Sequence, residues 1–266
     1  MLACSVSDPY HRGRPNYRDA AVAAVGGTGG STLVELAYLD MTSPAAEALA
    51  ARYASEEDRR QADRHHHPPA RRQRLMVRVL LRAILARRYP MPAHSWRILR
   101  DADGAPRLAT DDPTVALPSV SLSHSGNMVA CAIGGGTRLG IDIELIRPDR
   151  QVTTLAGAAF GPAEAGMVAT RGVDAFYRIW TLREALAKAS GAGFGLLIDR
   201  TDRVPPDPDA PVARRNVGGT EWDFAYWRLP EPYGLGLVWQ SGLVWQSSAA
   251  GIQVPVPDRL GAASPG

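Results

Sequence analysis

Lysine is nearly absent from this chain of 266 residues, because Lys188 is the only lysine among its 30 lysines and arginines. Cysteine is also scarce, with two residues. Cys4 and Cys131 are too few for a disulfide framework, which excludes a disulfide-stapled domain and favours a reducing compartment. No apolar run reaches the ~18 residues that a membrane span needs, and the first residues lack a secretory pattern. We therefore expect a cytoplasmic protein with no membrane partner and a buried free thiol at Cys131.

The overall composition is that of a folded protein. Hydrophobic residues make up 45% and charged residues 21% of the chain, which excludes global disorder. The formal net charge is +3 and the pI about 9.1, so anionic partners are favoured. The basic residues are not interleaved with aromatic side chains on which bases could stack, so nucleic acid is not the expected partner.

The two ends of the chain differ from its middle. Residues 1–30 end in GGTGG, and residues 247–266 are rich in alanine, proline, glycine and serine, so we expect a flexible leader and a flexible tail. Between them one order of elements occurs twice, namely a strand, then helices, then strands. This repetition predicts an α+β fold of two similar halves, residues 31–138 and 139–246.

The hydrophobic pattern predicts the individual elements. Helices are expected over residues 45–53, 70–89, 163–169 and 175–190 and from Ser55 onward, and strands over 33–39, 96–99, 119–123, 128–133, 139–144, 222–229 and 235–240. Glycines 134–136 predict a hairpin between two of these strands, and residues 198–217 predict a loop. Arg74, Arg78 and Arg82 share one face of the helix at 70–89, either as a basic wall or as a solvated face.

The strongest local signal is the segment GIDIE at residues 140–144. Alternate side chains of a strand share a face, so Ile141 and Ile143 point into a core while Asp142 and Glu144 point together to the other side. Two carboxylates on one face supply oxygen ligands of the kind that Mg²⁺ prefers, alongside waters and substrate phosphates. A charged, solvent-exposed strand face explains the same pattern, and the strand alone does not decide between the two.

A second signal lies in the predicted helix at 175–190. Trp180, Glu184 and Lys188 are spaced at i, i+4 and i+8 and so form one stripe. Glu184 and Lys188 form either an ordinary surface ion pair or an extension of the acidic pair, with a third carboxylate and a lysine one turn away that meets a phosphate. The helix alone fits both interpretations.

The third signal is SLSHSG at residues 121–126, where a predicted strand ends in Ser123 and His124. Polar residues at strand ends often line functional sites. A serine hydrolase is the weaker interpretation, because a nucleophilic serine usually sits in a G-x-S-x-G elbow between a strand and a helix, whereas another strand follows here. His124 as an ordinary structural histidine stays open.

In this order and spacing, SLSHSG, GIDIE and WTLREALAKASGAG resemble the 4′-phosphopantetheinyl transferase superfamily, and within it the longer monomeric type of the surfactin-synthetase activator. The resemblance covers roughly residues 33–245. It implies two α+β halves fused into a pseudo-dimer with the site in the cleft between them. It also implies a monomeric enzyme that moves the 4′-phosphopantetheine arm of coenzyme A to a serine of an apo acyl or peptidyl carrier protein, releasing adenosine 3′,5′-bisphosphate. Such carriers are acidic and serve fatty-acid, polyketide or peptide synthesis.

The resemblance also implies roles for the acids and the lysine. Asp142 and Glu144 match the pair that holds Mg²⁺, or Mn²⁺ in its place, against the pyrophosphate of coenzyme A. Glu184 matches a third acid that helps to bind the metal and serves as the base for the carrier serine, directly or through a water. Lys188 matches a lysine near the pyrophosphate.

Further residues are matched to the phosphates of coenzyme A. Ser123 and His124 correspond to a pair that contacts them, with His124 adding positive charge where the reaction builds negative charge. Arg60 and Arg64 lie where the family places basic residues for the 3′-phosphate.

The sequence departs from the family at two places. A segment that usually reads Gly-Lys-Pro or Gly-Arg-Pro is Gly104-Ala105-Pro106 here, followed by Arg107. Either Arg107 substitutes for the missing cation or that contact is absent. Position 183 is an arginine where lysine is common, which keeps the charge.

Two other functions compete with carrier modification. A metal-dependent phosphodiesterase or nuclease would use the same three acids with water as the nucleophile. A non-enzymatic nucleic-acid-binding protein would use the arginine-rich helix, and its binding would weaken steeply with salt. The fate of coenzyme A in the presence of an apo carrier protein separates the first from the transferase.

Overall fold

The computed structural model describes residues 34–206, 210, 212–229 and 232–241, together with the backbone of strands β1 (Ala21–Val25) and β11 (Ile252–Gln253). The predicted leader and tail otherwise lie outside the described residues. The two backbone strands pair with each other, and β1 also pairs with β2 (Val34–Asp40), so the first sheet takes strands from both of these segments.

The first half places three helices beside a sheet. Its elements are β2, α1 (Pro44–Tyr53), α2 (Glu56–Asp63), α3 (Pro68–Arg88), the short helix η1 (Ala93–Ser95), β3 (Arg97–Arg100), β4 (Pro106–Ala109), β5 (Ser119–Ser125) and β6 (Met128–Gly134). Helix α2 begins as expected at Ser55, whose hydroxyl accepts the Asp58 amide while the Asp58 carboxylate accepts the Ser55 amide. Strand β6 lies between β2 and β5, and α3 packs on this sheet.

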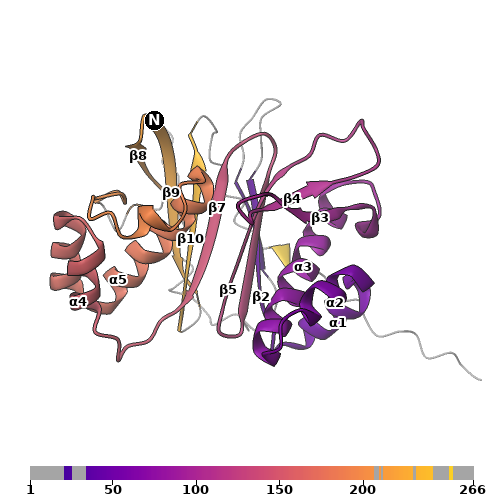
Figure 1. The fold of residues 1–266 in the computed structure, drawn as a ribbon, viewed down its shortest axis with the longest axis horizontal. Helices are drawn as coiled ribbons and strands as arrows, with labels where there is room; N and C mark the ends of the chain where they lie inside the picture. The colour runs from indigo at the N-terminus through magenta and orange to yellow at the C-terminus, as the bar shows by residue number, and fades with distance from the viewer. Residues whose placement is uncertain are drawn as a thin grey trace, which may run out of the picture.

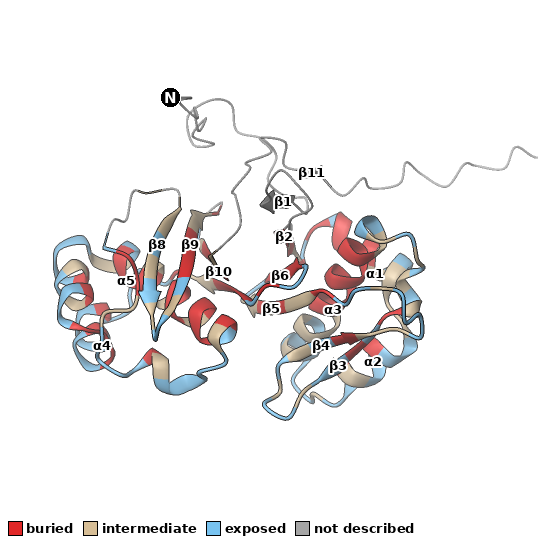
Figure 2. Ribbon diagram, turned by 90° about the horizontal axis from the view of Figure 1, so that it is seen from above, coloured by how far each residue is buried: buried red, intermediate tan, exposed pale blue. Residues whose placement is uncertain are grey.

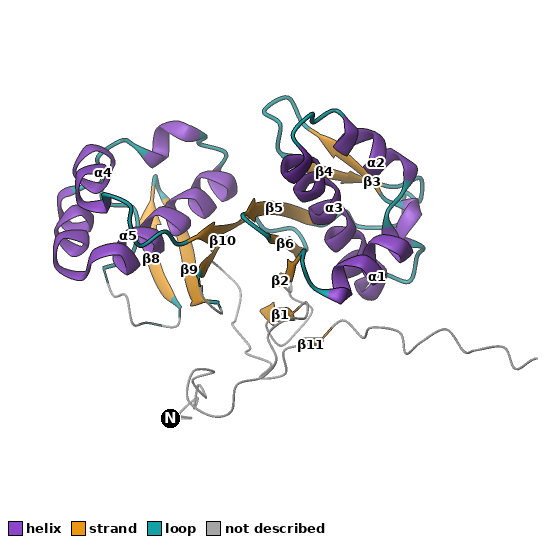
Figure 3. Ribbon diagram, turned by 90° about the horizontal axis from the view of Figure 1, so that it is seen from below, coloured by secondary structure: helices purple, strands orange, loops and turns teal. Residues whose placement is uncertain are grey.

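The second half repeats this order. Its elements are β7 (Leu139–Leu145), α4 (Val152–Ala159), α5 (Pro162–Ser190), the short helix η2 (Phe194–Leu197), β8 (Ala213–Val217), β9 (Thr220–Arg228) and β10 (Tyr233–Gln240). The sheet order β7-β10-β9 repeats the order β2-β6-β5, and every pairing is antiparallel. The α+β class is confirmed, and the repeated strand order supports the prediction of two similar halves. Figure 1 shows the halves side by side with β5 and β7 between them, and Figure 3 shows α3 and α5 on the two sides.

Several predicted elements are wrong in detail. The hairpin expected across glycines 134–136 does not form, because both edges of β6 are already paired with β2 and β5, and the chain passes to the other sheet, where β7 pairs with β10. Strand β8 begins within the predicted loop at 198–217, and β4 and α4 were not predicted. By contrast, the two helices expected at 163–169 and 175–190 are confirmed as the two parts of α5, because the backbone at Gly172, where φ is 69°, is not helical.

Three hydrophobic clusters make up the core. One lies between β2, β6 and helices α1 and α3, and a second surrounds α5. The third joins strands of both sheets, with Leu36 and Ala132 from the first half and Ile141 and Leu237 from the second. Figure 2 shows the buried residues on the inner faces of the elements. Cys131 is a buried free thiol, as predicted, and burial raises its pKa. Among the described residues, no helix has the length and apolarity to cross a membrane.

A buried arginine on the long helix of each half fixes the turn that follows that helix. Arg82 on α3 bonds the Asp58 carboxylate at 2.5 Å and donates to the carbonyls of Ala93 and Trp96 at 2.7 and 2.9 Å. Arg183 on α5 bonds the Glu164 carboxylate at 2.7 Å. Its other donors reach the carbonyls of Thr201 and Leu196 and the Asp199 carboxylate, at 2.7, 2.6 and 2.9 Å. The two halves therefore repeat an interaction as well as a topology.

The predicted face of Arg74, Arg78 and Arg82 is divided. Arg78 and Arg82 bond Asp58, which is itself fully buried, so neither lies on a solvated face. Arg78 nevertheless reaches the lining of the cleft described below, whereas Arg82 does not. Arg74 is half-buried and lines the cleft described below. The helical spacing of the three arginines could not show which of them are buried, because Asp58, which bonds two of them, lies on a different helix.

Candidate active site

The site begins with the close approach of β7 to α5. A Cβ atom at Gly140 would lie 2.0 Å from the carbonyl oxygen of Ala185 and 2.7 Å from the amide nitrogen of Ala189, so only glycine allows this distance. Ile141 and Ile143 are buried in the core as predicted, and Asp142 faces the next turns of α5. Gly140 therefore lets β7 approach α5 closely enough for Asp142 to contact Lys188.

We expect Gly140→Ala to destabilise the protein by about 1–3 kcal/mol, because the new methyl group forces strand and helix apart. Gly157 on α4 is the matched control: a Cβ there meets nothing within 4 Å, so Gly157→Ala should be neutral or stabilising. Guanidinium denaturation of both variants measures the difference. Equal stability of the two variants would contradict the close-approach role of Gly140.

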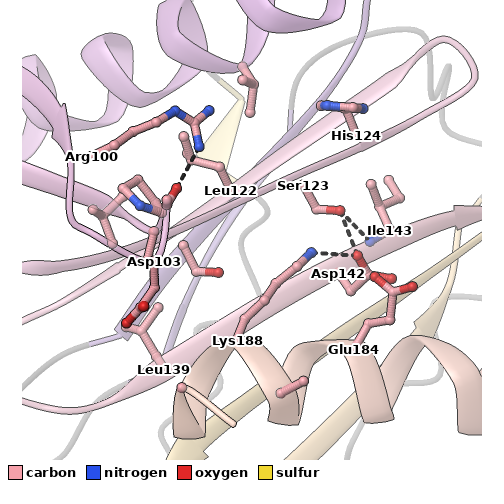
Figure 4. Close-up of a pocket in the computed structure, with 18 of the residues that line it drawn as sticks. Arg100, Asp103, Leu122, Ser123, His124, Leu139, Asp142, Ile143, Glu184 and Lys188 are labelled. Carbon is pink, nitrogen blue, oxygen red and sulfur yellow. Dashed lines mark hydrogen bonds and ion pairs between the residues drawn. The ribbon is translucent and has the colours of Figure 1, made fainter. Parts of the chain in front are cut away.

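Asp142 is the centre of the site, and its side chain is buried rather than solvent-exposed. Only 2% of Asp142 is exposed, and its Oδ1 accepts bonds from Lys188 Nζ and Ser123 Oγ, both at 2.7 Å. Lys188 also donates to the carbonyl of Ile141 at 3.1 Å. Figure 4 shows Lys188 and Ser123 pointing at Asp142. The exposed-strand interpretation is therefore wrong for Asp142, and Lys188 pairs with this strand acid rather than with Glu184.

Glu144 and Glu184 complete an acidic cluster with Asp142. Burial, and then repulsion from Asp142, raise the pKa of Glu184 to about 7. The same two causes raise the pKa of Glu144, although the Ser125 hydroxyl, which donates to Glu144 at 2.9 Å, opposes the shift. The three carboxyl groups therefore sense one another's charge, as the interpretation of Glu184 as a third acid requires.

The donor set fits a divalent cation that is completed by a phosphorylated ligand. Oδ2 of Asp142 is buried and, within the described part of the chain, has no hydrogen-bond partner. Among the described residues no three acidic, histidine or cysteine side chains form a ready-made metal site. Mg²⁺ is usually bound by one or two carboxylates with waters and substrate phosphates, so a closed cage is not required. An unpaired buried oxygen within a repulsive acidic cluster is a site that a cation stabilises.

The acids line one part of a cleft whose other wall comes from the first half. The cavity has a volume of about 560 Å³ and is lined by residues of both halves. On the wall of the first half lie Arg74, Arg100 and His124. Burial, and then the charges of Arg74 and Lys188, lower the pKa of His124. The cleft thus has an acidic cluster on one side and arginines on the other, which would suit a phosphorylated ligand together with a cation held by the acids.

The structure brings some predicted coenzyme A ligands into the cleft and leaves others outside. Gly104 and Pro106 line it, as do Ser123, His124 and Lys188. Arg107 is exposed on β4 and is not among the lining residues, nor are Arg60 and Arg64. Arg60 is ion-paired with Glu57 at 3.1 Å on the surface of α2.

Arg100 is the residue that sequence reasoning missed. It pairs in register with Pro106 across the hairpin of β3 and β4, and its guanidinium donates to the carbonyl of Gly104 at 2.6 Å. It therefore places a positive charge beside Ala105, where the sequence lacks a cation. The available signal was the position of Arg100 directly after the strand predicted at 96–99, and β4, which positions it, was not predicted.

The α+β fold thus places an acidic cluster with Lys188, and several arginines of the first half, around one cleft, which suits an anionic ligand. Residues 138–238 match the family model of the 4′-phosphopantetheinyl transferase superfamily. This part of the chain, which carries GIDIE and α5, is therefore similar to that superfamily.

Several proteins that are named 4′-phosphopantetheinyl transferases are similar to parts of the chain. A putative 4′-phosphopantetheinyl transferase of Synechocystis is 26% identical over 58% of this chain and 62% of its own length. The 4′-phosphopantetheinyl transferase HetI of Nostoc is 36% identical over 29% of this chain and 34% of its own. The 4′-phosphopantetheinyl transferase Sfp of Bacillus subtilis is 28% identical over 46% of this chain and 53% of its own. The chain thus spans less than two thirds of each of these relatives.

Proposed function

We propose that this protein transfers the 4′-phosphopantetheine arm of coenzyme A to a serine of an apo carrier protein and releases adenosine 3′,5′-bisphosphate. One observation carries the proposal: Asp142, Glu144 and Glu184 line the same cleft as Arg74 and Arg100. Acids that hold a cation, opposite cations that hold phosphates, suit a ligand with a pyrophosphate and a further phosphate. The family match over residues 138–238 and the names of the relatives support it.

In the proposed reaction, the carrier serine oxygen attacks the phosphorus atom next to the pantetheine arm. The serine O–H proton passes to the Glu184 carboxylate, directly or through a water, and a new P–O bond forms. The bond from this phosphorus to the bridging pyrophosphate oxygen breaks, and adenosine 3′,5′-bisphosphate leaves with the electron pair. A pKa of about 7 suits Glu184 to accept a proton near neutral pH. Lys188 faces the cleft, where negative charge develops on the leaving group, and its ammonium group balances that charge. His124 lines the same cleft, but its lowered pKa favours the neutral imidazole, so it acts as a hydrogen-bonding group and not as the positive charge that the sequence predicted.

Asp142, Glu144 and Glu184 are the residues that would hold Mg²⁺ or Mn²⁺. When bound, the cation neutralises charge on the pyrophosphate oxygens. Lys188 already balances Oδ1 of Asp142, which leaves the unpaired Oδ2 for a ligand role. A monomeric state, a cytoplasmic location and an acidic carrier remain predictions.

The defining experiment incubates the full chain with coenzyme A, Mg²⁺ and an apo carrier protein, and follows the carrier by mass spectrometry. We expect the carrier to gain the mass of one phosphopantetheine arm. When EDTA is present from the start to remove the cation, we expect no mass gain. Hydrolysed coenzyme A beside an unmodified carrier would identify a phosphodiesterase instead. DNA binding that survives Asp142→Asn, without any transfer, would identify a nucleic-acid-binding protein.

The cleft makes a prediction about coenzyme A binding. Arg100→Ala should raise the KM for coenzyme A by about tenfold, since one charge-assisted contact to a phosphate contributes roughly 1.5 kcal/mol. Arg60→Ala, which removes an exposed side chain outside the cleft lining, should change this KM less than twofold. The reverse result would restore the sequence-based prediction for Arg60, and steady-state kinetics with saturating carrier decide between them.

A further inference from the structure

Three serines of β5 connect the edges of the two sheets. β5 is the last strand of the first sheet and β7 the first strand of the second, and the two are not paired by backbone hydrogen bonds. Instead, the hydroxyls of Ser121, Ser123 and Ser125 accept the backbone amides of Ile141, Ile143 and Leu145, at 3.1, 3.2 and 3.0 Å. We call these three residues the serine ladder. Alternate residues of a strand share a face, and the ladder uses three of the four hydroxyls on one face of β5, all except that of Ser119.

Two members of the serine ladder make a second bond, in each case to an acid of the site. Ser123 donates to Asp142 at 2.7 Å, and Ser125 donates to Glu144 at 2.9 Å. Each serine thus accepts the amide of one residue and donates to the carboxylate of the residue before it. The matching partner of Ser121 would be residue 140, a glycine, which has no side chain to hold.

The chemistry of the hydroxyl determines what the serine ladder can do. A hydroxyl has one hydrogen to donate, and in Ser123 and Ser125 that hydrogen is engaged by a carboxylate. A contact from Ser123 to a phosphate of coenzyme A would have to break its bond to Asp142. The first half therefore fixes the orientation of both strand acids through the same atoms that join the halves.

We propose that Ser123 and Ser125 are positioning residues that set the two strand carboxylates for a divalent cation, whereas Ser121 only joins the strands. The inference rests on the proposed function for the identity of the cation, but its direct readout is cation binding. Residues that orient metal ligands typically change metal affinity by about 10- to 100-fold when removed.

The test compares Ser123→Ala and Ser125→Ala with Ser121→Ala in the full chain. Mn²⁺ binding is measured by electron paramagnetic resonance, with and without coenzyme A, and thermal melting is measured in parallel. All three variants lose an acceptor for a backbone amide, so all should melt at lower temperature. The Mn²⁺ dissociation constant should rise about tenfold or more in the first two variants and less than twofold in Ser121→Ala.

An unchanged Mn²⁺ affinity in Ser123→Ala and Ser125→Ala, or an equal loss in Ser121→Ala, would overturn the inference. So would a wild-type protein that binds no Mn²⁺ under either condition. If Ser123→Ala does not fold, Ser125→Ala carries the test, because its hydroxyl is only partly buried. A wild-type chain that binds Mn²⁺ with this serine dependence but modifies no carrier would refute the proposed function and leave the inference standing.

Discussion

Asp142→Asn should abolish transfer, with a loss of about 10³-fold or more, while the melting temperature stays the same or rises. The amide keeps an oxygen for the bonds from Ser123 and Lys188 but loses the charge that a cation requires. It also removes a buried carboxylate whose Oδ2 has no partner in the described part of the chain. Transfer assays and thermal melts on one preparation measure both effects.

The contrast to this variant lies one residue away. Ile141 is fully buried on the opposite face of β7, so Ile141→Asp should unfold the protein by placing a charge in the core that joins the halves. Loss of transfer in Asp142→Asn together with a large loss of stability would assign Asp142 to the core instead. Full transfer by Asp142→Asn at ordinary Mg²⁺ would remove it from the site.

The same variant changes the pH dependence of stability. The pKa of Glu184 rises from 4.5 to about 7 on folding in the metal-free protein, because of burial and then the charge of Asp142. A carboxyl group with a raised pKa stabilises the fold fully below pH 4.5, and this contribution is lost as the pH rises through 7. Guanidinium denaturation between these pH values should show a shallower decline in Asp142→Asn. An identical slope in both proteins would contradict the repulsion between the two acids.

Arg183→Ala should cost about 3–5 kcal/mol, because it leaves the buried Glu164 carboxylate without its charged partner. Two backbone amides, those of Arg203 and Val204, would still bond Glu164. The variant also frees the carbonyls of Leu196 and Thr201, so the segment after α5 loses its attachment. Urea denaturation measures the cost.

The matched control for this variant is Arg97→Ala. Arg97 forms an exposed ion pair with Asp111 at 2.7 Å, and such pairs contribute about 0–1 kcal/mol. Arg183→Lys should fall between the two, since an ammonium group keeps the charge but cannot match the planar guanidinium across four partners. A cost below about 1 kcal/mol for Arg183→Ala would show that Glu164 is satisfied without the arginine.

The sequence predicted what depends on local pattern. Strand periodicity placed Ile141 and Ile143 in the core, and the signal at Ser55 placed the start of α2. The repeated element order predicted the two similar halves. Each of these follows from residues that are close together in the chain.

What sequence reasoning missed depends on contacts between distant segments. The burial of Arg78 follows from Asp58 on another helix, and the partner of Lys188 follows from the approach of β7 to α5 at Gly140. The pairing of β6 was mispredicted because adjacency in sequence favours a hairpin, whereas β2, almost a hundred residues earlier, occupies that edge. The burial of Arg183 against Glu164 could not be predicted, because a charged side chain is expected at the surface.

The cleft draws its charged residues from both halves, although each half has a hydrophobic cluster of its own. Each half has a hydrophobic cluster of its own and a buried arginine that bonds a carboxylate, Arg82 in the first half and Arg183 in the second. A third cluster contains residues of both halves. Asp142 and Glu184 come from the second half, and Arg74 and His124 from the first. Either half expressed alone would hold an incomplete charge pattern however well it folded. A complete set of acids and arginines around one cleft therefore requires both halves together.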